Sequence, residues 1–266
     1  KEPGSDSNSE QEISRRTTII CLLILIALAF LIRFRVGFYQ QLNFDGCGYV
    51  MHSRSIVRGH LTTPYWAKGV DHYYQPLYPF LISLCYRLIQ DWIWSAKLVN
   101  HLLGALLLIP FYVLGKRIYG RVGGIFTASL LVSYPLLVEL SSNGASEPAF
   151  LLSFGFGLSF FHRLLEEKKF RLSLFSGFCF GLAYLARTQA LILPVISGLI
   201  IFWEVFQKRL KLKKGLIWAV LLFAGFYVFA LTYDLYCLKK DGIYSFRARP
   251  EFFKKVSEPE TVGWFI

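Results

Sequence analysis

The feature that most limits the fold of this chain is a series of long apolar runs. They cover residues 17–32, 95–115, 122–140, 147–163, 172–187, 190–206 and 215–237. Several approach the roughly 20 apolar residues with which a helix crosses a bilayer. Hydrophobic residues make up 55% of the 266 residues, which excludes a soluble domain of this length. The sequence therefore predicts an all-α polytopic membrane protein with about seven transmembrane helices.

Positive charge lies between these runs and is concentrated in short clusters. The formal net charge is +12, and most Lys and Arg residues flank the apolar runs. This distribution is typical of topology signals and of contacts with lipid headgroups. We therefore expect membrane lipids as partners and no nucleic acid.

One short segment, residues 75–90, decides the predicted orientation. It is apolar but contains two prolines near its start. If it does not cross and the N-terminus is inside, residues 141–146 and 188–189 lie outside with almost no positive charge. The inner loops then hold the three basic clusters, at residues 116–121, 168–171 and 208–214. The positive-inside rule favours this arrangement, to which Lys239-Lys240 beyond the last run is an exception.

This topology divides the chain into three regions. Residues 1–16 are polar and should form a disordered cytoplasmic N-terminus. Residues 17–237 form the transmembrane domain, whose outer loop, residues 37–94, should carry interfacial helices. Residues 238–266 should form an extracytoplasmic tail. We expect the chain to be part of a longer protein of a bacterial inner (plasma) membrane.

The predicted topology places Asp45 at the outer membrane face. It lies in Asn-Phe-Asp-Gly-Cys-Gly-Tyr, residues 43–49, shortly after the first apolar run. A carboxylate at a membrane face is a candidate functional group. It could act as a general base that deprotonates an acceptor hydroxyl, or as a metal ligand. The alternative is structural, because Asp in this context can turn the chain or cap the following helix.

Two further charged residues reach the same face. Glu147, in Ser-Glu-Pro, is a candidate acid of an outer cavity. The alternative is a helix start with Ser146 as N-cap and the acid and proline in the first turn. Arg187 ends the run 172–187 and is a candidate phosphate anchor, because its guanidinium has a forked geometry. Extension to lipid headgroups would also explain Arg187.

A metal site in the outer loop is a weaker hypothesis. His52, His60 and His72 share this loop with Asp45 and Asp71. Their spacings match no compact ligand motif, so polar interfacial histidines are the favoured interpretation. We predict no cofactor, and the sequence leaves dependence on a divalent metal open.

Common motifs for other chemistry are absent from the sequence. There is no phosphate-binding G-x-x-x-x-G-K-[ST] and no H-E-x-x-H, which argues against an ATP-driven pump. The five cysteines are scattered without a C-x-x-C and indicate neither a zinc site nor a disulfide framework. The sequence leaves open whether one disulfide forms between two of the three cysteines that could lie near one face, Cys47, Cys85 and Cys237.

Several short motifs, in a characteristic order, carry a family resemblance. They are Phe44-Asp45, Tyr49, Ser53-Arg54 with Gly59, Gln75-Pro76-Leu77-Tyr78-Pro79-Phe80-Leu81, Lys97-Leu98-Val99-Asn100, Leu114-Gly115-Lys116-Arg117-Ile118-Tyr119-Gly120, Tyr134-Pro135, Ser146-Glu147 and Leu185-Ala186-Arg187. In this order the chain resembles the membrane glycosyltransferases of superfamily C from about residue 17 to residue 206. The most similar branch holds the protein O-mannosyltransferases and the lipid A aminoarabinose transferases.

The resemblance implies transfer of a sugar from a polyprenyl-phosphate donor to a lipid, glycan or protein acceptor at the outer face. Asp45 matches the catalytic carboxylate of the first outer loop. The candidate substrate-binding residues are Arg187, Glu147, Gln75, Tyr49, Arg54 and Tyr74. Two positions depart from the family pattern. Gly46 replaces a second acid that often follows the catalytic Asp, and Gln75 replaces a basic residue or His before the proline motif.

Two other classes of function remain as alternatives. A secondary transporter would place binding groups near the middle of broken helices, often in repeated halves. Charged residues here avoid the centres of the runs, and no repeat is found. A non-catalytic assembly subunit that keeps the fold is the second alternative, and Gly46 favours it.

Overall fold

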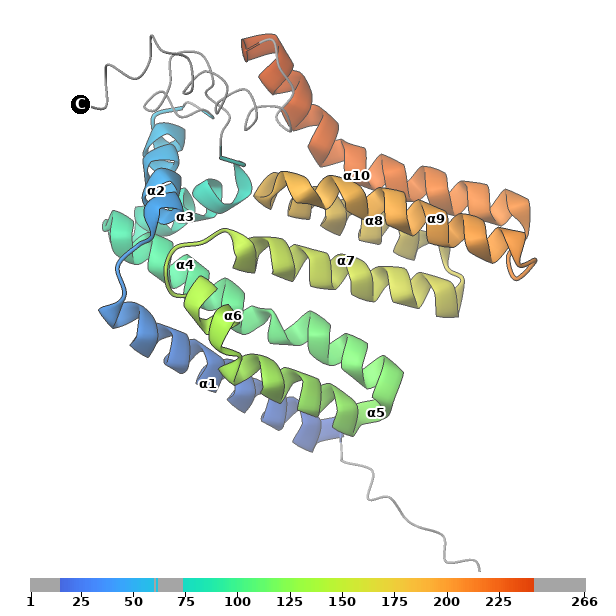
Figure 1. The fold of residues 1–266 in the computed structure, drawn as a ribbon, viewed down its shortest axis with the longest axis horizontal. Coiled ribbons are helices and arrows are strands. Elements are labelled where there is room, and N and C mark those ends of the chain that lie inside the picture. The colour runs from blue at the N-terminus through green and yellow to red at the C-terminus, as the bar shows by residue number, and fades with distance from the viewer. Residues whose placement is uncertain (1–14, 60, 62–73, 242–266) are drawn as a thin grey trace, which may run out of the picture.

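The computed structural model describes residues 15–59, 61 and 74–241, and all regular structure in these residues is helical (Figure 1). The elements are α1 (Arg15–Tyr39), α2 (Phe44–Val57), α3 (Leu77–Ile89), α4 (Trp92–Leu106), α5 (Leu108–Ser133), α6 (Pro135–Leu140), α7 (Glu147–Glu167), α8 (Phe170–Ala186), the 3-10 helix η1 (Thr188–Leu191), α9 (Ile192–Phe206) and α10 (Leu212–Asp241). The predicted all-α class is confirmed for the described residues. Most of the predicted N-terminal region and tail, residues 1–14 and 242–266, lies outside them.

The helices are those of an integral multi-pass membrane protein. Five stretches of the described chain are long and apolar enough to cross a membrane: Arg16–Tyr39, Trp92–Ser133, Glu147–Glu167, Thr188–Phe206 and Leu212–Lys239. Helices α3 and α8 are apolar but shorter, with 13 and 17 residues. The first stretch continues beyond Ile32, where the apolar run of the sequence ends. Arg33 therefore lies within α1 and does not flank it, and its side chain is fully buried against α5.

The longest apolar stretch, Trp92–Ser133, doubles back on itself within α5. The backbone leaves the helical conformation at Tyr119 (φ −125°, ψ 15°) and Gly120 (φ 74°, ψ −175°). The second of these conformations is open almost only to glycine. Figure 1 shows the chain reversing direction at this bend. The two arms pack together, because a Cβ added at Gly115 would lie 2.4 Å from Thr127 Oγ1.

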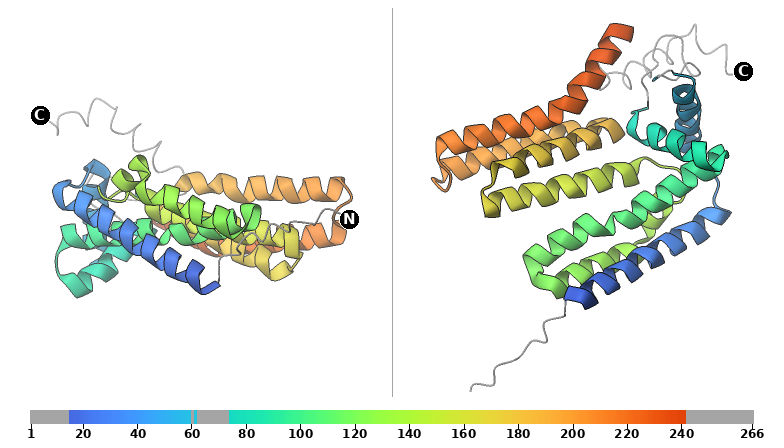
Figure 2. Two further views of the ribbon diagram at one scale, coloured as in Figure 1. Left: turned by 90° about the horizontal axis from the view of Figure 1, so that it is seen from below. Right: turned by 180° about the vertical axis from the view of Figure 1, so that it is seen from behind.

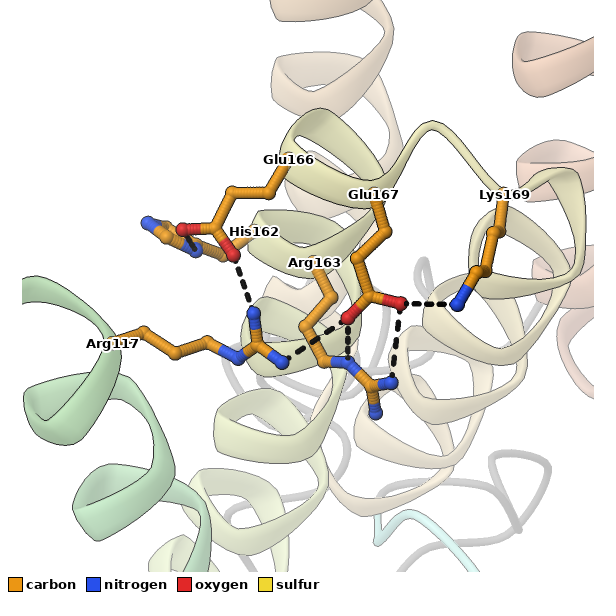
Figure 3. A network of polar contacts seen from close by, with 6 residues as sticks. All are labelled: Arg117, His162, Arg163, Glu166, Glu167 and Lys169. Carbon is orange, nitrogen blue, oxygen red and sulfur yellow. Dashed lines mark hydrogen bonds and ion pairs between the residues drawn. The ribbon is translucent and has the colours of Figure 1, made fainter.

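The long helices turn at two opposite ends of the bundle (Figures 1 and 2). One end holds the bend of α5, the α7–α8 turn and the α9–α10 turn, which carry the three basic clusters of the sequence. We call it the basic end. Figure 3 shows its ion pairs: Glu167 accepts from Arg117 (3.1 Å), Arg163 (2.9 Å) and Lys169 (3.0 Å), and Glu166 also pairs with Arg117. These contacts tie the bend of α5 to the end of α7.

The opposite end, which we call the loop end, holds the short helices α2, α3 and α6 (Figure 1). The 13 residues of α3 span only about 20 Å as a helix. The hydrocarbon core of a bilayer is about 30 Å thick. This length agrees with the prediction that the segment 75–90 does not cross the membrane.

Buried cations hold the helix ends beneath the loop end. Lys97 Nζ donates to the carbonyl oxygens of Gly37 (2.8 Å) and Gln40 (2.7 Å) at the end of α1. Arg33 Nη1 donates to Val132 O (3.2 Å) near the end of α5. Both side chains are almost fully buried. A cation at a helix C-terminus satisfies orphan carbonyls and complements the helix dipole, so these contacts fix where the loops above them begin.

Helix α8 packs between α7 and α10 and forms a second core with them. Phe180, Tyr184 and Phe226 are each buried to 2% exposure or less in this core. All five cysteines are free, so the bridge that the sequence left open among Cys47, Cys85 and Cys237 is absent. Only Cys237 of the five is fully buried.

Candidate functional site

Asp45 lies in the first turn of α2 at the loop end. Asn43 is the N-cap of this helix, and its side chain accepts a hydrogen bond from Gly46 N at 2.6 Å. The capping role that competed with a functional role for Asp45 is therefore filled by Asn43. The carboxylate of Asp45 stays partly exposed, near the positive end of the helix dipole, where negative charge is stabilised.

Tyr74 is the contact of Asp45 that crosses from another segment. Its hydroxyl donates to Asp45 Oδ1 over 3.4 Å, which is a long hydrogen bond. The Tyr74 ring meets that of Tyr49 edge-on, with centroids 4.6 Å apart. Tyr49 in turn meets Tyr78 of α3 at 5.1 Å. This buried aromatic cluster lies next to Asp45.

Tyr49 connects this aromatic cluster to the start of α7. Its hydroxyl donates to Ser146 Oγ at 2.8 Å. Burial raises the pKa of the Tyr49 hydroxyl to about 12, despite the opposing effects of the hydrogen bond to Ser146 and of Arg187. Tyr49 is therefore neutral at physiological pH and can donate a hydrogen bond, but it cannot act as a base.

Arg187 follows α8 and its side chain meets the first turn of α7. Its Nη1 forms an ion pair with Glu147 Oε1 and lies 3.5 Å from Ser146 Oγ. The side chains of Arg187 and Glu147 are 25% and 29% exposed. Within the part of the chain that the structure describes, Nε and Nη2 of Arg187 contact no acceptor. One edge of the guanidinium is thus held and the other edge is open.

The contacts form one continuous line, from Asp45 through Tyr74, Tyr49 and Ser146 to Arg187 and Glu147. Four of the residues predicted from the sequence to bind substrate, namely Tyr74, Tyr49, Glu147 and Arg187, therefore share one site with Asp45. The structure only partly fits the alternative roles of these residues, which were a capped helix start at Ser146-Glu147 and extension of Arg187 to lipid headgroups. Ser146 holds the N-cap position of α7 without a capping hydrogen bond from its side chain, and Arg187 pairs within the protein.

The remaining predicted residues have other surroundings. Gln75 precedes α3 and is 5% exposed, and its Oε1 is buried without a hydrogen-bond partner in the described structure. Arg54 lies in the last turn of α2 with its guanidinium 5.5 Å from the ring centroid of Trp92, in a cation–π contact. No contact joins Arg54 to the line of residues around Asp45 in the described structure.

The histidine cluster is only partly visible. His52 Nε2 lies 2.8 Å from Leu61 O and is engaged with this backbone carbonyl. His60, His72 and Asp71 lie outside the described residues. Among the residues that are described, no three His, Cys, Asp or Glu side chains are grouped so as to hold a metal ion.

The structure gives a physical reason for Gly46. A Cβ at this position would lie 2.9 Å from Asn143 O and 3.3 Å from Gly144 Cα. Both atoms belong to the backbone of the loop that precedes α7, and this loop accepts a hydrogen bond from Asn43 N at 2.9 Å. A second acid after Asp45 would therefore collide with the loop that brings Ser146 and Glu147 to the site.

Sequence reasoning missed two residues of this region. Ser146 was interpreted as a helix cap and as part of a family motif, but not as a residue of the site. Asp234, near the C-terminal end of α10, accepts hydrogen bonds from Tyr184 at 2.9 and 3.0 Å. Tyr184 lies in the last turn of α8, directly before Arg187, so this acid approaches the end of α8 that carries Arg187. An acid inside the last apolar run was the available signal.

Comparison with known families decides the class of protein. The family model described as dolichyl-phosphate-mannose-protein mannosyltransferase, PMT_2, matches residues 71–233. The chain belongs to this family. The PMT_2 proteins are membrane glycosyltransferases of superfamily C, as the motif order predicted, and the family points to an enzyme that uses a polyprenyl-phosphate sugar donor. No curated protein matches the chain.

The PMT_2 match covers only part of the candidate site. Tyr74, Gln75, Glu147 and Arg187 lie within the matched residues, whereas Asp45 precedes them. The family therefore supports the donor and the class of reaction. The individual roles of the site residues remain predictions.

Proposed function

We propose that this PMT_2 protein transfers a sugar from polyprenyl phosphate to a hydroxyl-bearing acceptor at the extracytoplasmic face of an inner or plasma membrane. The basic end would face the cytoplasm, as the positive-inside rule favours. Counting the two arms of the Trp92–Ser133 hairpin and α8 separately gives seven crossings. The loop end, with α2 and α3 lying at the interface, would then face outward.

The proposed reaction is a single displacement at the anomeric carbon with inversion. The acceptor oxygen forms a bond to this carbon as the bond to the donor phosphate oxygen breaks. Asp45 takes the proton of the acceptor hydroxyl as the nucleophile forms. The polyprenyl phosphate leaves as an anion and needs no acid. The open edge of Arg187 stabilises the charge that grows on the leaving phosphate.

The observation that carries this proposal is the line of contacts between Asp45 and Arg187. A displacement needs a base on one side of the anomeric carbon and an anion-binding group on the other. Asp45 and Arg187 come from α2 and the end of α8, which are far apart in sequence. Tyr74, Tyr49 and Ser146 join them at the loop end.

Labelled donors test the proposal directly. Membranes containing the chain would be incubated with radiolabelled polyprenyl-phosphate mannose, and in parallel with other polyprenyl-phosphate sugars. We expect one sugar to enter a lipid, glycan or protein fraction. Asp45→Asn should lower this transfer on the order of a hundredfold or more, because Asn keeps the shape but cannot accept the proton. Full transfer by Asp45→Asn at equal protein level would refute the catalytic role.

A further inference from the structure

We infer that Glu147 is a positioning residue, which aims the open edge of Arg187 at the donor phosphate. This inference rests on the proposed function and assigns a role within the same site. It explains how the acidic side chain of Glu147 can favour binding of the anionic donor phosphate.

The contacts of the Arg187 guanidinium are all on one side. Nη1 donates to Glu147 Oε1 and, more distantly, to Ser146 Oγ. Nε and Nη2 contact no acceptor among the described residues. These two N–H groups are parallel, and such a pair is the geometry with which Arg binds phosphate bidentately. A side chain with this many rotatable bonds needs a fixed contact to present one edge reproducibly.

The partners on Nη1 are themselves well fixed. Glu147 lies in the first turn of α7, followed by Pro148, which restrains the backbone there. Ser146 Oγ is held by the hydrogen bond from the buried Tyr49 hydroxyl. The contacts of Nη1 with Glu147 and Ser146 thus fix the Arg187 guanidinium relative to the start of α7. Through Ser146 and Tyr49, the same contacts connect the guanidinium of Arg187 to the part of the site that holds Asp45.

Two other roles for Glu147 make different predictions. A competitor would occupy Arg187 until the donor phosphate displaces it, so its removal would tighten donor binding. A simple tie between α7 and α8 would affect folding and leave donor binding unchanged. Positioning alone predicts that donor binding weakens on removal of Glu147 and that this effect needs the forked guanidinium.

The test is a double-mutant cycle on the KM for the donor. We expect Glu147→Ala to raise this KM on the order of tenfold, the size of a lost hydrogen bond to a charged group, with little change in kcat. Glu147→Gln should stay close to the native KM, because its amide oxygen still accepts from Nη1. Arg187→Lys should raise the KM, and Arg187→Gln should raise it further. In the Arg187→Lys background, Glu147→Ala should add nothing, since an ammonium group has no edge to aim.

A matched control lies at the other end of α7. Glu166 also pairs with an arginine of another helix, Arg117, at the basic end (Figure 3). Glu166→Ala removes an acid–arginine contact of the same kind, although Glu167 still holds Arg117, and it should leave the donor KM unchanged. A KM that falls in Glu147→Ala overturns the inference in favour of competition. Equal effects of Glu147→Ala in the native chain and in the Arg187→Lys background overturn it in favour of direct contact with substrate.

The outcomes also separate this inference from the proposed function. If the native chain transfers no sugar from any labelled donor, the proposed function fails. If it does transfer, and Arg187→Gln raises the donor KM while Glu147→Ala does not, only the positioning role fails. Folded protein is measured for each variant by detergent-solubilised yield and thermal unfolding. A loss of yield in Glu147→Ala with native KM in the remaining protein identifies the simple tie.

Discussion

At the scale of single residues, the hydroxyl of Tyr74 is the contact that most directly affects the proposed base. Tyr74 is 4% exposed, and its ring packs against Tyr49, so Tyr74→Phe should keep the fold. The change removes the hydrogen bond to Asp45 Oδ1. We expect kcat to fall by about three- to tenfold, the usual worth of one hydrogen bond, with the donor KM unchanged. Steady-state kinetics at equal protein level check this, and an unaltered kcat would mean that Tyr74 only packs.

The same scale shows what the sequence could predict of the site. The residues Asp45, Tyr49, Glu147 and Arg187 were predicted from motif order and from the topology that puts their segments at one face. Their contacts could not be predicted, because these depend on the loop that precedes α7. That loop leaves no room for a side chain at Gly46 and turns the Ser146 hydroxyl toward Tyr49 in place of a capping position.

At the scale of elements, the close approach of α8 and α10 depends on Gly177. A Cβ at this position would lie 2.1 Å from Leu222 O, a backbone atom that a rotamer change cannot move. We therefore expect Gly177→Ala to destabilise the protein by about 1–3 kcal/mol, the usual cost of overpacking a core. Thermal unfolding in detergent measures the effect.

A glycine on α9, Gly198, provides a control for which alanine is not expected to lower the stability. A Cβ at Gly198 would meet Phe223 at 3.4 Å, which is ordinary van der Waals distance. Gly198→Ala should be neutral or stabilise by about 0.5–1 kcal/mol, because alanine favours the helix. Equal losses in the two variants would show that any Cβ is tolerated poorly in these helices, and that the α8–α10 contact has no special role.

Elements were predicted well in type and less well in extent. Four of the seven predicted apolar runs correspond to the single helices α1, α7, α8 and α10, because length and hydrophobicity dominate in a membrane. The run 95–115 covers α4 and the first arm of α5, and the run 190–206 covers η1 and α9. The run 122–140 is divided at Tyr134 into the second arm of α5 and the short α6. The extension of α1 past Arg33 could not be foreseen. A buried cation there is acceptable only because carbonyl oxygens of α1 and α5 accept its hydrogen bonds.

At the scale of the whole molecule, the two ends differ in charge and in the kind of structure they carry. The turns at the basic end hold the three Lys and Arg clusters, whereas the loop end holds the short helices and the candidate site. The sequence predicted this division from charge alone. The bundle reproduces it, because the chain reverses at Gly120 and at each later turn. Which end faces the cytoplasm is the part that an experiment must decide.

Cysteine labelling in intact cells decides the orientation. Cys47 is exposed on α2 at the loop end, so a chain that keeps Cys47, with the other four cysteines changed to Ala, carries a native reporter. We expect a membrane-impermeant maleimide to label it from outside. A second chain has all five cysteines changed to Ala and carries Lys213→Cys in the exposed start of α10 at the basic end. It should be labelled only after permeabilisation, because the basic clusters are predicted to be cytoplasmic.

Denatured samples of both chains, labelled to completion, control for expression and for the reactivity of each thiol. If Lys213→Cys is labelled in intact cells and Cys47 of the other chain is protected, the orientation is the reverse of the predicted one. The carboxylate of Asp45 and the open edge of Arg187 would then face the cytoplasm. An outward-facing acceptor could not reach them, so the proposed site of transfer would be wrong even if the chain transfers sugar. Protection of Lys213→Cys and labelling of Cys47 would instead place the base and the phosphate-binding group together on the extracytoplasmic side, as the proposed reaction requires.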